Sequence, residues 1–306
     1  MVYLERFVIP SSEQEDEFFW CLYDRAYDFL PKRQLQYYEN LRTACHNSVY
    51  PFHIFTAESG FSSMEFEPIT IFYGGNGTGK TTLLNIIAEK LQINRTAAFN
   101  KSSFFDIYLQ YCRAYTDSDI PESSRIITSD DVFNYILDVR AMNEGIDNRR
   151  EELFAEYGKL KKKSLSYRWK SLDDYENFHK MMRIRNLSSG KYVMSELGFN
   201  TQEHSNGENA FTYFTDKIKE NALYLLDEPE NSLSPARQLH LVKFIEEAAR
   251  FYDCQFIIST HSPFLLALPY AKIYDLDRVP VTTAKWTELE NVRIYFDFFE
   301  KHRGEF

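Results

Sequence analysis

The chain has 306 residues, of which 44% are hydrophobic, enough for a large α/β domain with a smaller second lobe. Its 35 Lys and Arg residues are outnumbered by 45 Asp and Glu residues, so the formal net charge is −10. This acidic balance argues against a broad basic surface for nucleic acid or for an anionic membrane, and it leaves only a local basic face open.

Cysteine usage and the N-terminus indicate the compartment. The thiols of Cys21, Cys45, Cys112 and Cys254 are scattered without a C-x-x-C pair, and we expect them to be buried or incidental. This pattern favours a reduced, cytoplasmic protein over a disulfide scaffold or a zinc site. The opening residues lack the apolar run of a signal peptide, and no stretch approaches 18 uninterrupted apolar residues. We therefore expect no insertion into a membrane.

In chain order, strand-like pieces near the N-terminus come first, and a clear buried strand, "ITIFYG", follows at residues 69–74. The next segment, "GGNGTGKTTLLNIIAEKL", starts with glycines and continues with apolar residues at helical spacing. These are Leu83, Leu84, Ile87 and Leu91. The sequence therefore predicts a strand, a glycine-rich loop and a helix in direct succession.

The middle of the chain has a different character. "SRIITSDDVFNYILDVR" predicts a strand, a turn capped by Ser129 or Asp130, and the start of a helix. Residues 131–195 are charged and lack strand alternation, so we expect a helical insertion. Its Lys161–Lys163 run is usually a solvated face, and contact with a polyanion is the alternative.

The last third alternates apolar strands with amphipathic helices. A helix is expected from Ser205, and strands at "NALYLL", "CQFIIST" and "AKIYDLD". The helix after Pro235 should bury one face, consisting of Leu241, Val242, Ile245, Ala249 and Tyr252. This alternation predicts an α/β fold with a mainly parallel sheet flanked by helices. We expect an N-terminal lobe at 1–130, a helical insertion lobe at 131–204 and the second half of the first lobe at 205–306.

The glycine-rich loop carries the strongest chemical signal. Gly74–Thr81 fits G-x-x-x-x-G-K-[ST], the phosphate-binding loop known as Walker A, between a strand and a helix as that motif requires. Lys80 should reach the β- and γ-phosphates of ATP, and Thr81 should ligate Mg²⁺. The expected ATP-binding residues are Gly74, Gly75, Asn76, Gly77, Thr78, Gly79, Lys80, Thr81 and Thr82.

Two further strand ends supply candidate chemistry. "LYLLDEPE" delivers Asp227 and Glu228 to the carboxyl end of a parallel strand, as a Walker B motif would. Asp227 is the expected Mg²⁺ residue, and Glu228 is the expected catalytic base that orients or deprotonates the attacking water. "FIISTHSPF" places His261 at the tip of another strand, suited to a hydrogen bond with the γ-phosphate or that water.

The stretch "SNGE" has two readings. Ser205, Asn206, Gly207 and Glu208 match the capping-box pattern Ser/Thr-x-x-Glu at the start of a helix. The same residues could present a helix N-terminus to a phosphate.

The motifs occur in a characteristic order: "GGNGTGKTT", "SNGE", "LLDEPENSLSP" and "STHSP". In this order they resemble the ABC-type P-loop ATPases, in particular the soluble branch around RecF, SMC and the OLD-like, stand-alone bacterial AAA family ATPases. The glutamate that ends "SNGE" fits this branch better than the glutamine usual in transporter subunits. The resemblance implies a Mg²⁺-dependent ATPase that forms a head-to-tail homodimer around ATP. In such a dimer the Ser205–Glu208 helix start caps the γ-phosphate bound to the other subunit, so both readings of "SNGE" hold together.

The chain departs from that family at three places. It lacks the glutamine that contacts Mg²⁺ between the phosphate loop and the signature, and Ser129 or Asp130 is the candidate replacement. Ser234 stands where transporter subunits have an aspartate. The aromatic residue that stacks on adenine is not assignable among Tyr3, Phe7, Phe52 and Phe55.

The preferred function is an ATPase switch or clamp that acts on a separate partner or effector protein. The ATP-binding subunit of a membrane transporter is the alternative. A sensor subunit that controls a toxic effector in bacterial defence is a third reading, and it rests on analogy alone.

Overall fold

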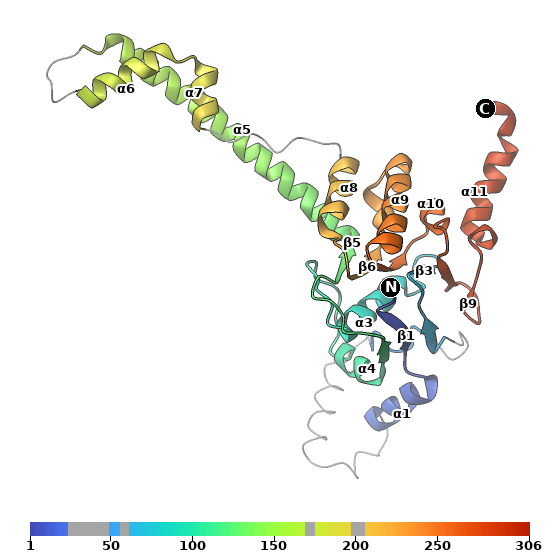
Figure 1. The fold of residues 1–306 in the computed structure, drawn as a ribbon. Coiled ribbons are helices and arrows are strands. Elements are labelled where there is room, and N and C mark those ends of the chain that lie inside the picture. The colour runs from blue at the N-terminus through green and yellow to red at the C-terminus, as the bar shows by residue number, and fades with distance from the viewer. Residues whose placement is uncertain (24–48, 56–60, 169–174, 197–205) are drawn as a thin grey trace, which may run out of the picture. The chain divides into compact units, whose positions relative to one another are not determined.

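The computed structural model describes residues 1–23, 49–55, 61–168, 175–196 and 206–306. The chain folds into two compact units, one formed by Met1–Phe133 with Asn206–Phe306 and the other by Asn134–Ser205 (Figure 1). The strands are β1 (Leu4–Val8), β2 (Ser63–Glu65), β3 (Ile69–Tyr73), β4 (Arg113–Thr116), β5 (Arg125–Thr128), β6 (Leu223–Asp227), β7 (Gln255–Ser259), β8 (Lys272–Asp275) and β9 (Thr282–Thr283).

The helices include a long one, α5, which starts in the first unit and continues into the second. They are α1 (Ser12–Tyr23), α3 (Lys80–Lys90), α4 (Phe105–Tyr111), α5 (Ser129–Ser166), α6 (Tyr175–Asn186), α7 (Ser189–Glu196), α8 (Asn206–Lys217), α9 (Pro235–Phe251), α10 (Pro263–Leu266) and α11 (Glu290–Lys301). Short 3₁₀ turns η4 (Pro229–Ser232), η5 (Trp286–Glu288) and η6 (Arg303–Glu305) complete the described elements. No helix in the described ranges is long and apolar enough to cross a membrane.

A six-stranded sheet forms the centre of the first unit, in the order β5-β6-β7-β3-β8-β9. Neighbours from β5 to β8 are parallel, and only β9 runs antiparallel to its neighbour β8. Every residue of β3, β6 and β7 is buried, as expected for strands covered on both faces. In Figure 1, α3 lies on one side of this sheet and α9 on the other. The prediction of a mainly parallel α/β sheet flanked by helices is confirmed.

A smaller antiparallel sheet, β2-β1-β4, lies beside the large one. The side chain of Gln255 joins the two sheets. It is fully buried, accepts hydrogen bonds from the amides of Tyr3 and Leu4 at 2.8 and 2.9 Å, and donates to the carbonyl oxygen of Leu4 at 2.9 Å. A buried amide that makes these bonds avoids the cost of an unpaired polar group.

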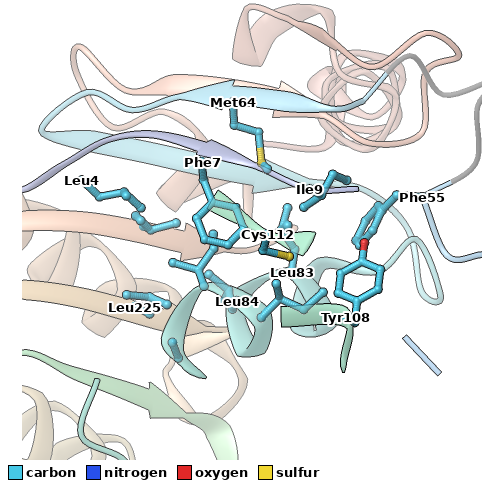
Figure 2. Packing of buried hydrophobic residues seen from close by; sticks show 14 of the residues in the cluster. Leu4, Phe7, Ile9, Phe55, Met64, Leu83, Leu84, Tyr108, Cys112 and Leu225 are labelled. Atoms are coloured by element: carbon cyan, nitrogen blue, oxygen red, sulfur yellow. The ribbon is translucent and has the colours of Figure 1, made fainter. Parts of the chain in front are cut away.

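The main hydrophobic core fills the space between the small sheet and α3 (Figure 2). Figure 2 shows Phe7 of β1 directed toward Cys112 and toward Leu83 and Leu84 of α3. All four side chains are at most 1% exposed. Leu83, Leu84 and Ile87, which were predicted at helical spacing, are fully buried in this core. Leu91, the fourth predicted residue, follows the end of α3 and is half-buried.

The structure corrects two local predictions. Thr128, rather than Ser129 or Asp130, caps α5: its hydroxyl accepts from the Asp131 amide at 3.3 Å, and the Asp131 carboxylate accepts from the Thr128 amide at 2.8 Å. This is a capping box shifted by one residue. On α9 the buried face is Leu241, Ile245 and Ala248, whereas Tyr252 is 54% exposed because it follows the helix end.

The second unit consists of helices in its described part. Leu153 of α5, Met181 and Ile184 of α6 and Val193 of α7 are buried together as apolar side chains. Lys161 of the basic run donates to the Arg185 carbonyl oxygen at 2.7 Å, at the C-terminal end of α6. A lysine in this position satisfies a free helix carbonyl. Lys161 of the Lys161–Lys163 run thus has a partner within the helical unit.

Candidate functional site

The glycine-rich loop, residues 74–79, connects β3 to α3. Gly77 and Gly79 have φ angles of 87° and 92°, in the left-handed region that side chains disfavour. At Gly79 a Cβ atom would also lie 2.9 Å from Cγ2 of Ile54 and 3.0 Å from the Phe55 ring. The backbone conformation at these two positions therefore favours glycine over any residue with a side chain. The loop wraps around a cavity of about 360 Å³ whose lining includes Asn76 to Thr82 and Glu228.

Lys80 is the first residue of α3 and is only 5% exposed. Its Nζ donates to the carbonyl oxygens of Gly74 and Gly75 at 2.7 and 2.9 Å, and it lies 4.0 Å from Oε1 of Glu228. The ammonium group is thus held at the loop by backbone oxygens and one carboxylate. This places a fixed positive charge beside the N-terminus of α3, where an anion would be favoured.

Thr81, in the first turn of α3, contacts Asp227, the last residue of β6. The Thr81 hydroxyl donates to Oδ1 of Asp227 at 3.1 Å. Burial raises the pKa of the Asp227 carboxyl above its ordinary value, and the charge of Glu228 acts in the same direction, whereas Thr81 and Lys80 oppose the shift. A hydroxyl and a carboxylate at this distance form a hard oxygen donor pair, which suits Mg²⁺. The residues present therefore fit the cation that the motif implies.

Glu228 and His261 face each other because β6 and β7 are neighbours. The Glu228 amide donates to the Ser259 carbonyl oxygen at 2.9 Å, and its φ of 47° is unusual for a residue other than glycine. Oε2 of Glu228 accepts from the Asn231 amide group at 3.0 Å. Nδ1 of His261 lies 3.8 Å from Oε1 of Glu228. Residues with an unusual backbone angle, such as the positive φ of Glu228, are common at functional sites, where surrounding contacts hold them in place.

Comparison with known protein families finds a match to one segment of the chain. Residues 205–267 match the family described as "AAA domain, putative AbiEii toxin, Type IV TA system". That segment runs from the predicted signature through Asp227 and Glu228 to the turn after His261. This match covers one segment of the chain, and it agrees with the resemblance to ABC-type P-loop ATPases that the order of the motifs indicates. No curated protein matches the chain.

Solved structures of similar fold include SMC heads and an ABC transporter. The SMC head of Pyrococcus furiosus bound to the C-terminal domain of ScpA has 13% identity and a TM-score of 0.38, and covers 79% of this chain and 95% of its own. The SMC head of Thermotoga maritima has 14% identity and a TM-score of 0.33, with 73% and 93% covered. A putative metal-chelate ABC transporter has 17% identity and a TM-score of 0.34, with 74% and 76% covered. These likenesses are too distant to transfer a function.

The predicted signature, residues 205–208, is only partly described. α8 begins at Asn206, but Ser205 and the side chain of Asn206 lie outside the described residues. Glu208 is described, and its Oε1 accepts from Arg237 of α9 at 2.7 Å. An ion pair thus ties the first turn of α8 to the first turn of α9.

The replacement for the family's glutamine has a defined place. Ser129 and Asp130 line a cavity of about 760 Å³ together with Thr81 and Asp227. The parallel pairing of β5 with β6, which aligns Thr128 with Asp227, brings these residues to the candidate metal site. Both candidates for the missing contact are therefore near that site.

The four aromatic candidates for stacking on adenine are all buried. Tyr3, Phe7, Phe52 and Phe55 are exposed by 3, 0, 3 and 7%. Rings packed into the core do not offer a free face to a base. Tyr50, which the sequence did not single out, lines the 760 Å³ cavity, and its hydroxyl donates to Thr82 at 3.3 Å.

Sequence reasoning also missed three residues that hold the site loops. Asp277 accepts the Gly75 amide with both carboxylate oxygens at 3.0 Å. Asn291, at the start of α11, donates to the His261 carbonyl oxygen at 2.8 Å. Glu230 contacts the turn around His261. Asp277 and Asn291 are far from their partners in the chain, so no local pattern could have found them. Glu230 had a signal, as the second glutamate of "DEPE".

Proposed function

We propose that this protein binds ATP with Mg²⁺ at the Gly74–Thr82 loop and hydrolyses it. The observation that carries the proposal is the Thr81–Asp227 hydrogen bond of 3.1 Å, with Lys80, Glu228 and His261 around it. Residues from three separate strand ends converge where α/β proteins bind ligands, at the carboxyl ends of parallel strands.

The loop residues would bind the phosphates. Residues Gly77 to Thr81 line the 360 Å³ cavity, so their backbone amides would bind phosphate oxygens, and Lys80 would add a positive charge. Thr81 and Asp227 would hold Mg²⁺, which neutralises charge on the β- and γ-phosphates when bound. Lys80 would exchange its present carbonyl partners for phosphate oxygens, which are stronger acceptors because they are charged.

Glu228 would act on water. Its carboxylate would accept a proton from a water molecule as the oxygen of that water bonds to the γ-phosphorus and the bond to the β-phosphate oxygen breaks. His261 lies on the same side, with Nδ1 at 3.8 Å from Glu228. It would orient that water or donate a hydrogen bond to the γ-phosphate.

A head-to-tail homodimer would complete the site. In this arrangement the start of α8, from Ser205 to Glu208, approaches the phosphate bound to the other subunit, where the amides and dipole of a helix N-terminus favour an anion. The ion pair between Glu208 and Arg237 supports this by fixing the start of α8 to α9. ATP binding would close the dimer and hydrolysis would reopen it. The protein would thus serve as a cytoplasmic switch or clamp for a separate partner protein, in a defence or DNA-related system.

The substitution Glu228→Gln tests the proposal. It keeps the shape of the side chain and removes the base, so we expect phosphate release to fall by about 10²–10⁴-fold while ATP still binds. Light scattering should show that the variant accumulates as a dimer with ATP. Glu247→Gln is the matched control, because Glu247 is an exposed residue of α9 paired with Lys243. Wild-type turnover by Glu228→Gln would refute the role given to this glutamate.

A further inference from the structure

The carboxylate of Glu230 lies in η4, directly after β6, and the residue is only 6% exposed. Three donors converge on its Oε1 atom. They are the Thr260 hydroxyl at 2.6 Å, the His261 amide at 3.0 Å and the Ser262 amide at 3.2 Å. A buried carboxylate needs such donors, because an unpaired charge in the interior is costly.

These bonds fasten the turn that carries His261 to the end of the neighbouring strand. The turn is braced further by Gln238 of α9, whose Oε1 accepts from the Ser262 hydroxyl at 2.6 Å. The His261 backbone is held on both sides, since Glu230 accepts from its amide and Asn291 donates to its carbonyl oxygen. The position of His261 is therefore set by side chains from three other elements.

The Nδ1 atom of the His261 ring lies near the carboxylates of both Glu228 and Glu230. Nδ1 of His261 is 3.7 Å from Oε1 of Glu230 and 3.8 Å from Oε1 of Glu228. Both separations are longer than a hydrogen bond, so it is the negative charge of the two carboxylates that favours the tautomer with its proton on Nδ1. Nε2 then has no proton and is the nitrogen left to accept a hydrogen bond from the attacking water.

We infer that Glu230 is a positioning residue for ATP hydrolysis, which holds His261 with Nδ1 toward the carboxylates and Nε2 free for water. The inference rests on the proposed function, and it adds a residue to which that function gave no role. A purely structural glutamate would also stabilise the turn, but it would not control the ring of His261.

The first test is a double-mutant cycle. Glu230→Gln keeps an acceptor oxygen and loses the charge, whereas Glu230→Ala loses both. We expect kcat to fall about 10–100-fold in Glu230→Ala and less in Glu230→Gln, with KM for ATP within about twofold of wild type. In a His261→Ala background, single-turnover experiments should show no further loss from either change. Glu247→Gln should leave kcat unchanged.

The second test reads the ring itself and needs no activity. Nitrogen-15 NMR of the histidine rings, recorded across an alkaline pH series, reports the tautomer of the neutral ring, with His261→Gln used to assign the signal. We expect the Nδ1-protonated tautomer in wild type and a mixture in Glu230→Gln, which also covers the case in which Glu230→Ala does not fold.

The outcomes separate the two ideas. Wild-type protein that does not hydrolyse ATP would overturn the proposed function. Active wild-type protein with an Nε2-protonated His261, or with equal losses from Glu230→Ala in both backgrounds, would overturn only the role of Glu230.

Discussion

The glycine-rich loop allows a stability prediction with an internal control. Gly77→Ala and Gly79→Ala place the same methyl group on backbone with nearly the same φ, 87° and 92°. An alanine in the left-handed region costs roughly 1–2 kcal/mol at either position. The surroundings differ: nothing lies within 4 Å of a Cβ at Gly77, whereas at Gly79 the Ile54 methyl and the Phe55 ring lie at 2.9 and 3.0 Å.

The difference between the two variants therefore isolates that collision. Ile54 and Phe55 belong to a packed region, and forcing an extra carbon into such packing costs about 1–3 kcal/mol. We expect Gly77→Ala to lose about 1–2 kcal/mol and Gly79→Ala about 2–5 kcal/mol. In a domain of this size each kcal/mol lowers the melting midpoint by about 2–4 °C.

The assay is thermal unfolding followed by circular dichroism, without nucleotide and with EDTA, so that ligand binding does not contribute. Gly145→Ala is a third variant: Gly145 lies inside α5 with nothing within 4 Å, and alanine there should stabilise the helix by up to about 1 kcal/mol. Equal midpoints for Gly77→Ala and Gly79→Ala would show that Ile54 and Phe55 do not crowd the loop, and the reasoning would be wrong.

Three further predictions concern binding, assembly and thiol chemistry. Lys80→Ala should abolish ATP binding in equilibrium titrations, because it removes the charge at the phosphate cavity; wild-type affinity would contradict the loop assignment. Ser205→Arg should still bind ATP but not hydrolyse it, and mixing it with Lys80→Ala should restore part of the phosphate release if one composite site can work alone; a folded, fully active Ser205→Arg protein would remove support for the signature. Burial raises the pKa of the Cys112 thiol to about 12 and also raises that of Cys254. Little thiolate therefore forms at about pH 8, and mass spectrometry should show far slower iodoacetamide labelling of both residues in the folded protein than in urea; equal rates would contradict their burial.

Several features follow from local sequence and could be predicted from it. Apolar runs such as Ile69–Tyr73 and Leu223–Asp227 specify buried strands, because every side chain of a strand covered on both faces must be apolar or paired. The glycines of the 74–79 loop follow from positive φ, which is a property of single residues. The parallel α/β fold could therefore be predicted from these patterns.

The sequence-based predictions were wrong at two helix ends, where a single residue decides where the helix starts or stops. The cap of α5 is Thr128 because its hydroxyl can exchange bonds with Asp131, and Ser129 and Asp130 offered equally good patterns. The periodicity of α9 extended past its true end to Tyr252, because an apolar repeat does not encode where a helix stops. The sequence could not distinguish among the four aromatic candidates for stacking on adenine. The structure shows that all four rings are buried, so none has a free face for a base.

The sequence by itself determined which residues are candidates for the chemistry. Lys80, Thr81, Asp227, Glu228 and His261 stand at strand ends or loop positions that local patterns reveal. Only the tertiary structure decided how they meet. The order β6-β7-β3 places the Glu228 and His261 strand ends side by side next to the loop strand, and the same order brings Glu230 under the His261 turn. Hydrogen-bond partners such as Asp277 for Gly75 lie about two hundred residues apart. Their pairing depends on strand order and helix packing, which are set by burial of the whole core and leave no mark in any short stretch of the chain.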